Sequence, residues 1–190
     1  SLEYFNDKEI AQIRDYVQEH NKQLWLAIQL LYYCFIRPRE MRSMQVSWIN
    51  IEYRYIEIPG THSKNKKTEK VIIPDAFIDQ LKEIKKIPGN YYVIGKGGLH
   101  GVEQVGLNNL NLQHSKILKK LGIKGRYAFY SWKHTGAVKC VKAGINLKDL
   151  QLQLRHHSLD MVNEYLKNLG VMDSTDLKIK GITTSLILNV

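Results

Sequence analysis

The chain has 190 residues, enough for one domain with a sizeable hydrophobic core and short for two. Lysine and arginine outnumber aspartate and glutamate by 28 to 18, so the formal net charge is +10, which favours a polyanionic partner such as nucleic acid or an acidic membrane surface. No stretch reaches the roughly 18 apolar residues of a membrane span, and no signal-peptide pattern opens the chain. We therefore expect one cytoplasmic domain.

The first half of the chain predicts helices around a small β-hairpin. Asn6 or Asp7 can cap a first amphipathic helix, and the apolar run that follows predicts a buried central helix. Alternating β-branched and aromatic residues then predict two strands joined by a polar, basic loop. The expected elements are a helix from residue 7, helices over 23–36 and from Pro38, strands over 51–58 and 70–73, and a helix over 75–86.

The second half of the chain predicts helices separated by glycines. The glycine-rich stretch 95–101 matches neither GxxxxGK[ST] nor a strand-bound GxGxxG, so we expect a surface loop and not a nucleotide site. Helices are expected over 108–121, 131–143, 147–154 and 159–169. The predicted fold class is thus α+β, mainly helical with a small antiparallel sheet inserted early.

Three short patterns contain the candidate functional residues. The sequence CFIRPREM (34–41) has Arg37 after an apolar helix and Glu40 three residues later. YSWKHTG (130–136) opens a helix, and LRHHSLDMVNEY (154–165) places two histidines before a capped helix that contains a tyrosine. Each pattern alone has an ordinary explanation, such as a helix ion pair worth a few tenths of a kcal/mol. Their order and spacing together carry more weight.

Together the patterns resemble the catalytic domain of the tyrosine recombinases, the phage integrase family. That family has RxxE on an early helix, a hairpin lysine, HxxRHT, LGH, and a tyrosine nine residues beyond the last histidine. Arg37 and Glu40 match RxxE, and Lys64 matches the hairpin lysine. His156 matches LGH, and Tyr165 lies nine residues after it. The resemblance covers about residues 6–169.

The resemblance has consequences for domain organisation and origin. It implies that residues 1–190 form the catalytic domain, with a C-terminal tail over 171–190, and that an N-terminal core-binding domain lies outside this chain. The motifs YSWKHTG and LRHHSLD look particularly like those of integrases from mobile elements in the Bacteroides group. A bacterial, cytoplasmic protein associated with the nucleoid when bound to DNA is therefore expected.

The resemblance also implies roles for the matching residues, in an enzyme that needs no metal, ATP or other cofactor. Tyr165 would attack a DNA phosphodiester, giving a 3′-phosphotyrosyl intermediate and a free 5′ hydroxyl. Arg37 would hold phosphate oxygens through its forked guanidinium, and His156 would hydrogen-bond one of them. Lys64 would protonate the leaving 5′ oxygen as general acid. Lys66 and Lys67 are rivals for that role and otherwise candidate DNA contacts.

Several positions depart from the family pattern. The HxxR motif reads Tyr130-Ser131-Trp132-Lys133, so a tyrosine replaces the histidine and a lysine replaces the arginine. Lys133 offers a charge without the fork, and Tyr130 is a poor base at neutral pH because a phenol has a pKa near ~10. For His134 we expect a structural role or a second phosphate contact. Arg155 stands where LGH has glycine. How Tyr165 loses its proton is left open.

Other functions compete with an active recombinase. The substitutions at Tyr130 and Lys133 would suit a catalytically impaired DNA-binding relative, and a type IB topoisomerase shares the same chemistry. A metal enzyme built on His156 and His157 is disfavoured, because adjacent histidines point in different directions and no HExxH spacing surrounds them. The resemblance implies double-stranded DNA as partner and a homotetramer on two DNA sites. The apolar stretch 182–190 is a candidate to reach a neighbouring protomer, or equally to close the core of its own domain.

Overall fold

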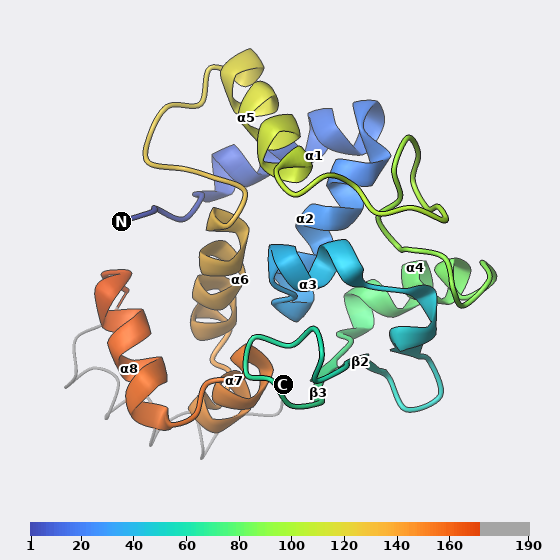
Figure 1. Ribbon diagram of the computed structural model, residues 1–190. Helices are drawn as coiled ribbons and strands as arrows, with labels where there is room; N and C mark the ends of the chain where they lie inside the picture. Colours follow the sequence, from blue (N-terminus) through green and yellow to red (C-terminus); the bar gives the residue numbers. More distant parts are fainter. Residues whose placement is uncertain (172–190) are drawn as a thin grey trace.

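The computed structural model describes residues 1–171, and this part of the chain is mainly helical (Figure 1). The α-helices are α1 (Asp7–His20), α2 (Lys22–Cys34), α3 (Pro38–Ser43), α4 (Asp75–Ile84), α5 (Asn109–Leu121), α6 (Ser131–Lys142), α7 (Leu147–Leu154) and α8 (Leu159–Asn168). A small antiparallel sheet lies between α3 and α4 in the chain. The predicted α+β class is confirmed, whereas the stretch 182–190 lies outside the described residues.

The helix starts follow from capping side chains, as the sequence predicts. The side chain of Asn6 accepts the Glu9 backbone N–H at 2.8 Å, and the Glu9 carboxylate accepts the Asn6 N–H at 3.0 Å, which forms a capping box at α1. At α7 and α8 the side chains of Asn146 and Ser158 accept backbone N–H groups of the first turn, without a reciprocal bond. The cap at Ser158 fixes where α8 begins and hence where Tyr165 lies.

The sheet differs from the predicted two-stranded hairpin. Its strands are β1 (Ile49–Asn50), β2 (Tyr55–Ile58) and β3 (Glu69–Ile72), in the order β1-β2-β3, with Ile56 opposite Val71. The prediction of one strand over 51–58 was wrong, because residues 51–54 form a turn. Within that turn Asn50 accepts the Tyr53 N–H at 2.9 Å and Arg54 takes a left-handed φ of 58°.

The apolar side chains form two clusters. The larger one joins α1, α2, α4, α5 and the buried side of the sheet. The smaller one lies among α6, α7 and α8 and consists of Phe35, Ala137, Leu150, Leu154, Val162 and Leu166, with Tyr165 packed at its edge. The smaller cluster therefore positions the α7–α8 pair against α6.

The first turns of α6 are held tightly from the core side. A Cβ at Gly136 would lie 2.2 Å from the carbonyl oxygen of Tyr32, so glycine lets α6 approach α2 closely. Thr135 accepts the Phe5 N–H at 3.0 Å, and the Trp132 indole donates to His114 at 2.9 Å. These contacts orient α6 so that its neighbouring residues 133 and 134 face α8.

The glycine-rich stretch 95–101 is an irregular loop, as expected. Short backbone bridges pair Tyr92 with Gly101 and Gly95 with Gln104, and the Gln23 side chain donates to the Gly95 carbonyl at 2.6 Å. Among the helices of the described residues, none is long and apolar enough to cross a membrane.

Candidate active site

The fold gathers the predicted site residues from separate segments into one region (Figure 1). Arg37 precedes α3, and Lys64 lies in the loop between β2 and β3. The other members belong to the start of α6, the α7–α8 junction and α8; they are Tyr130, Lys133, His134, His156 and Tyr165.

Arg37 offers unused hydrogen-bond donors. Its backbone N–H donates to the Glu40 carboxylate at 3.0 Å, and its side chain, 13% exposed, has one terminal nitrogen 3.6 Å from that carboxylate. The buried Nε and Nη1 atoms of Arg37 have no hydrogen-bond partner among residues 1–171. Because buried donors are normally satisfied, this guanidinium is suited to bind an anion.

Glu40 is held by a second arginine, Arg155, whose two terminal nitrogens both make hydrogen bonds. Arg155 donates to both Glu40 oxygens, at 2.8 and 2.6 Å, and each side chain is 2% exposed. Arg155 also donates to Glu69 and to the Phe35 carbonyl, both at 3.2 Å. Burial alone would raise the pKa of Glu40, but the hydrogen bonds and charge of Arg155 hold that pKa below its ordinary value. The network joins α3, β3 and the α7–α8 junction.

Sequence reasoning missed this network. It noted Arg155 only as a departure from glycine, and it did not single out Glu69. Arg155 closes α7 with a left-handed φ of 60°, a conformation that explains why glycine suits this position. A charged residue in a glycine position was a usable signal, but its partner Glu40 lies 115 residues away and could not be identified from spacing.

The loop that carries Lys64 is fastened to the same network. The Lys64 backbone N–H donates to Glu40 at 3.1 Å, and the Asn65 amide donates to Glu69 at 2.9 Å and to the Arg155 carbonyl at 3.2 Å. Ser63 adds a hydrogen bond to Glu69 at 2.6 Å. The loop thus presents the exposed Lys64 side chain from a fixed backbone.

Lys64 differs from Lys66 and Lys67 in its electrostatic effect on the other site residues. The Lys64 ammonium is one of the nearby charges that lower the pKa of Lys133 and of His156. Lys66 and Lys67 are exposed and are not among the main causes of either shift. Of these three hairpin lysines, Lys64 lines the same hollow as Arg37.

A hollow of 670 Å³ opens beside these residues. Its lining includes Arg37, Arg39, Arg42, His62 and Lys64. The hollow is therefore bordered by cationic and polar side chains, as a binding site for a phosphate backbone requires.

Lys133 and Tyr130 form a pair at the start of α6. The Lys133 ammonium donates to the Tyr130 hydroxyl at 3.0 Å and lies 5.2 Å from the ring centres of both Tyr130 and Tyr165. Burial, together with the charges of Arg37 and Lys64, lowers the pKa of Lys133 to about 8. Lys133 is 7% exposed and still carries a positive charge at neutral pH.

The Tyr165 hydroxyl lies against His134. The His134 Nδ1 is 2.7 Å from the Tyr165 Oη, and the His156 ring packs edge-on against the Tyr165 ring with centres 5.5 Å apart. Burial raises the pKa of Tyr165 well above its ordinary value. Nothing in the sequence spacing indicates the contact with His134, because the two residues are 31 positions apart on different helices.

Both histidines of the cluster are neutral at physiological pH. Burial, and then the charge of Lys133, lowers the pKa of His134 to about 4, and the same causes with Arg37 and Lys64 lower that of His156 to about 4. The His156 Nδ1 is buried without a hydrogen-bond partner among the described residues. The site therefore combines a phenol, neutral imidazoles and fixed cations, a set suited to transfer of a phosphoryl group to the phenol.

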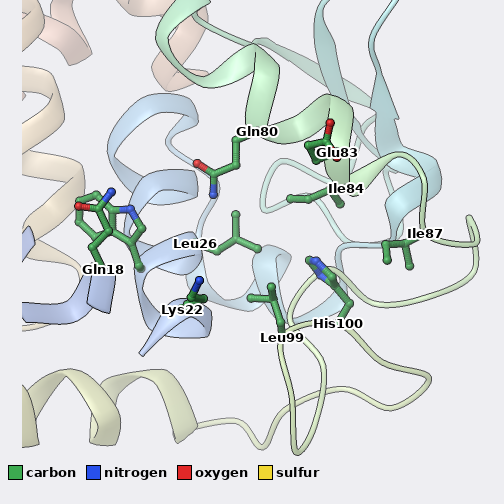
Figure 2. Close-up of a pocket in the computed structure, with 10 residues that line it drawn as sticks. Gln18, Lys22, Leu26, Gln80, Glu83, Ile84, Ile87, Leu99 and His100 are labelled. Atoms are coloured by element: carbon green, nitrogen blue, oxygen red, sulfur yellow. The ribbon is translucent and has the colours of Figure 1, made fainter. Parts of the chain in front are cut away.

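A second hollow lies away from this cluster, between α1, α2, α4 and the glycine-rich loop (Figure 2). Its volume is 360 Å³, and Leu26, Ile84 and Leu99 contribute apolar surface. Two of its titratable side chains are already engaged, since Glu83 pairs with Lys86 at 2.9 Å and His100 bonds the Val93 carbonyl at 2.7 Å. None of the predicted site residues lines it. Of the two hollows, the one beside Arg37 is the better candidate.

Comparison with known proteins agrees with the geometry. A curated tyrosine recombinase from Pseudothermotoga lettingae is 24% identical over 150 residues, which cover 77% of this chain and 50% of that protein. The crystal structure of XerA recombinase superposes with a TM-score of 0.70 at 16% identity, covering 98% of this chain and 66% of the other.

Two solved DNA complexes share the fold. The Tn1549 transposon integrase bound to a circular intermediate DNA has a TM-score of 0.70 at 14% identity and covers 85% of this chain and 60% of the other. A lambda integrase dimer bound to a COC′ core site has a TM-score of 0.64 at 20% identity, over 86% and 58% of the two chains.

The extent of these matches defines what the chain represents. It spans about half the length of the curated relative. The model of the phage integrase family matches residues 3–170, which include every member of the cluster. The chain therefore belongs to the phage integrase family.

Proposed function

We propose that this chain carries the catalytic site of a site-specific DNA recombinase or integrase, which cleaves and rejoins strands through a bond between Tyr165 and a backbone phosphate. The observation that carries the proposal is the cluster itself. Tyr165, a partly buried tyrosine on α8, lies beside Lys133, and the charges of Arg37 and Lys64 act on that lysine. Membership of the phage integrase family supports the same chemistry.

The proposed reaction exchanges one phosphate ester for another. The Tyr165 oxygen attacks phosphorus, its bond to phosphorus forms, and the bond to the 5′ oxygen breaks. Arg37 and His156 hydrogen-bond the phosphoryl oxygens through the atoms that have no partner in the described residues. Lys133 adds a fixed charge, and Tyr130 contacts the phosphate from beside it. Because the ester bond energy is conserved, neither ATP nor a metal is needed.

Lys64 is the proposed general acid. It donates a proton to the leaving 5′ oxygen, and its backbone bond to Glu40 keeps the loop in place while the side chain stays exposed to the substrate. Lys66 and Lys67 would contact the DNA backbone farther along the loop. This division of roles is supported by the electrostatic effect of Lys64 on Lys133 and His156.

The proposed substrate is double-stranded DNA of a mobile element. The net charge of +10 and the cationic hollow support a DNA partner, and the Tn1549 and lambda relatives are described in complexes with DNA. From the resemblance we further propose a Bacteroides-type element, a bacterial cytoplasmic setting with association to the nucleoid, and a homotetramer that joins two DNA sites.

Trapping of a covalent adduct tests the function without knowledge of the target site. The protein is incubated with nicked, sheared genomic DNA of its host, SDS is added, and protein-linked fragments are recovered by potassium precipitation and sequenced. We expect fragments that share one junction, with the DNA joined to Tyr165. Equal recovery with Tyr165→Phe would overturn the assignment.

The same assay separates the alternatives. Salt-sensitive DNA binding without any adduct would favour a catalytically impaired relative. Relaxation of supercoiled plasmid without strand exchange between sites would favour a topoisomerase. For the general acid, we expect Lys64→Ala to lose roughly 10²–10⁴-fold in rate, whereas Lys66→Ala keeps chemistry and weakens binding.

A further inference from the structure

His134 corresponds to the second histidine of the family's HxxRHT pattern, and the sequence alone suggested only a structural role or a phosphate contact for it. It lies on α6 directly after Lys133, and its Nδ1 is 2.7 Å from the Tyr165 Oη, with ring centres 5.5 Å apart. We propose that His134 is a catalytic residue that accepts the Tyr165 proton during strand cleavage and returns it during rejoining. This inference rests on the proposed function and answers how the nucleophile is activated.

The residue at the family's histidine position does not compete for this proton. The Tyr130 hydroxyl is occupied by the Lys133 ammonium at 3.0 Å. Burial raises the pKa of Tyr130, although the charges of Arg37 and Lys64 oppose the shift, so Tyr130 stays a protonated phenol. A protonated phenol can donate a hydrogen bond but cannot serve as the base.

His156 is also poorly placed as the acceptor. Its ring is perpendicular to the Tyr165 ring, at 89° with centres 5.5 Å apart, and among the described residues it makes no hydrogen bond to the Tyr165 hydroxyl. Among the described residues, His134 is the side chain that hydrogen-bonds the Tyr165 Oη. In effect, the acceptor function has moved along α6 from position 130 to position 134, about one helical turn.

The ionisation states allow this role and also restrain it. Because burial and Lys133 keep His134 neutral, its Nδ1 has a lone pair for the Tyr165 proton when Nε2 carries the hydrogen. Transfer is unfavourable in the free protein, since the pKa of Tyr165 is raised while that of His134 is lowered. A bound phosphate would favour the imidazolium, as an opposite charge does. The tyrosine is thus activated when DNA is present.

The proton count is balanced over the full cycle. The Tyr165 O–H bond breaks and an N–H bond forms on His134 as the oxygen attacks phosphorus, while Lys64 protonates the leaving 5′ oxygen. In rejoining, a 5′ hydroxyl attacks, and the departing Tyr165 oxygen recovers its proton from His134. No oxidant, reductant or metal takes part.

A substrate with sulfur in the 5′ bridging position separates this role from that of the general acid. The sulfur leaves as a thiolate, whose conjugate thiol has a pKa near ~8.5, and so requires no proton donor. The target junction is the one recovered by adduct trapping. With the normal substrate we expect His134→Ala to slow adduct formation by roughly 10²–10⁴-fold. With the sulfur substrate we expect Lys64→Ala to recover and His134→Ala to remain slow.

Added imidazole should restore part of the His134→Ala rate, because it supplies the lost base. The matched control is His157→Ala, which changes an exposed histidine between α7 and α8 and should keep the wild-type rate. A normal rate in His134→Ala would overturn the inference. A loss of DNA affinity that fully accounts for the lower rate would instead assign His134 a phosphate contact.

A measurement in the free protein keeps the inference separate from the proposed function. With ¹⁵N-labelled histidine, the His134 Nδ1 should report an unprotonated acceptor whose resonance shifts in Tyr165→Phe. The change should be much smaller in His156→Gln. If the His134 Nδ1 is protonated, or if its resonance does not change in Tyr165→Phe, the inference is overturned even if wild-type protein forms adducts. If the Nδ1 signal is as expected but wild-type protein forms no adduct, the proposed function and the proton transfer are both overturned. The hydrogen bond between His134 and Tyr165 would still stand.

Discussion

Arg37 and Arg155 both contact the carboxylate of Glu40, but the rest of each guanidinium lies in different surroundings. Arg155 reaches both Glu40 oxygens, Glu69 and the Phe35 carbonyl, and its side chain is 2% exposed. Arg37 lies 3.6 Å from Glu40 and has no hydrogen-bond partner for Nε or Nη1 among residues 1–171, whereas in Arg155 only Nε lacks one. The terminal nitrogens of Arg155 are used in contacts within the protein, whereas those of Arg37 remain available to a ligand.

The comparison explains why a glutamate follows Arg37 at a spacing of three. Glu40 accepts backbone N–H groups from Arg37 and Lys64, which lie 27 positions apart in the sequence. Its negative charge is balanced mainly by Arg155, so Arg37 keeps its own charge for the substrate. Glu40 therefore positions two proposed catalytic side chains without neutralising the phosphate-binding one.

The largest expected effect comes from Arg155→Met. Removing the guanidinium leaves the buried Glu40 with only the longer contact to Arg37, and breaking a buried ion pair in this way costs about 3–5 kcal/mol in the free energy of unfolding. Methionine must adopt the same left-handed backbone as arginine, so the change reports mainly on charge. Urea unfolding measures the loss. The double variant Arg155→Met, Glu40→Met should recover part of it, and a loss below about 1 kcal/mol would contradict the structural role.

Acid should weaken the wild-type domain through the same pair. The folded-state pKa of Glu40 is lowered from 4.5, so its contribution to stability is present above pH 4.5 and is lost as the pH falls through the folded value. We expect unfolding free energies measured at decreasing pH to fall more steeply in wild-type protein than in Glu40→Gln. Parallel profiles would contradict the lowered pKa.

The next largest effect is on catalysis. Arg37→Ala should reduce the rate of adduct formation by roughly 10²–10³-fold, the cost of removing a transition-state donor, while urea unfolding changes little. Arg37→Lys keeps a charge without the fork and should recover only part of the rate. If Arg37→Ala destabilised the domain as strongly as Arg155→Met, the contrast between the two arginines would be wrong.

The two arginines also mark how far sequence reasoning reaches. Local signals predicted the capped starts of α1, α7 and α8, because a cap depends on residues three positions apart. The order of RxxE, LGH and tyrosine identified the family, which the match over residues 3–170 confirms. Local patterns failed at 51–54, where a side-chain turn at Asn50 overrides an alternating, β-prone pattern.

Contacts between distant segments could not be predicted in the same way. The Arg155–Glu40 pair spans 115 positions and depends on how α7 packs near α3. The His134–Tyr165 contact spans 31 positions and depends on how α6 packs against α8. That packing is decided by close approaches such as Gly136 against Tyr32, which a single sequence does not reveal. Sequence patterns therefore supplied the candidate residues of the site, whereas their hydrogen-bond partners could not be predicted.

Lys133 offers an intermediate effect with a distinctive pH dependence. Its pKa is lowered to about 8 from 10.5, so the rate should fall above pH 8 by about tenfold per unit as the ammonium loses its charge. Stability should change in the opposite sense, rising between pH 8 and 10.5, because the unfolded chain binds more protons there. Lys133→Arg keeps its charge and should extend the active range upward. An unchanged alkaline limit in that variant would contradict the role of Lys133.

The smallest predicted effect concerns Glu69, which connects Arg155 to the loop between β2 and β3. Glu69 is 9% exposed and accepts from Arg155, Ser63 and Asn65. Glu69→Gln keeps an acceptor but removes the charge, so we expect a loss of about 1–2 kcal/mol in unfolding free energy, less than in Arg155→Met because Glu40 still pairs with the arginine. The rate should fall only modestly, through looser placement of Lys64. If the rate instead fell as far as in Lys64→Ala while stability was unchanged, Glu69 would act directly in the site and the division between structural and substrate-binding charges would have to be redrawn.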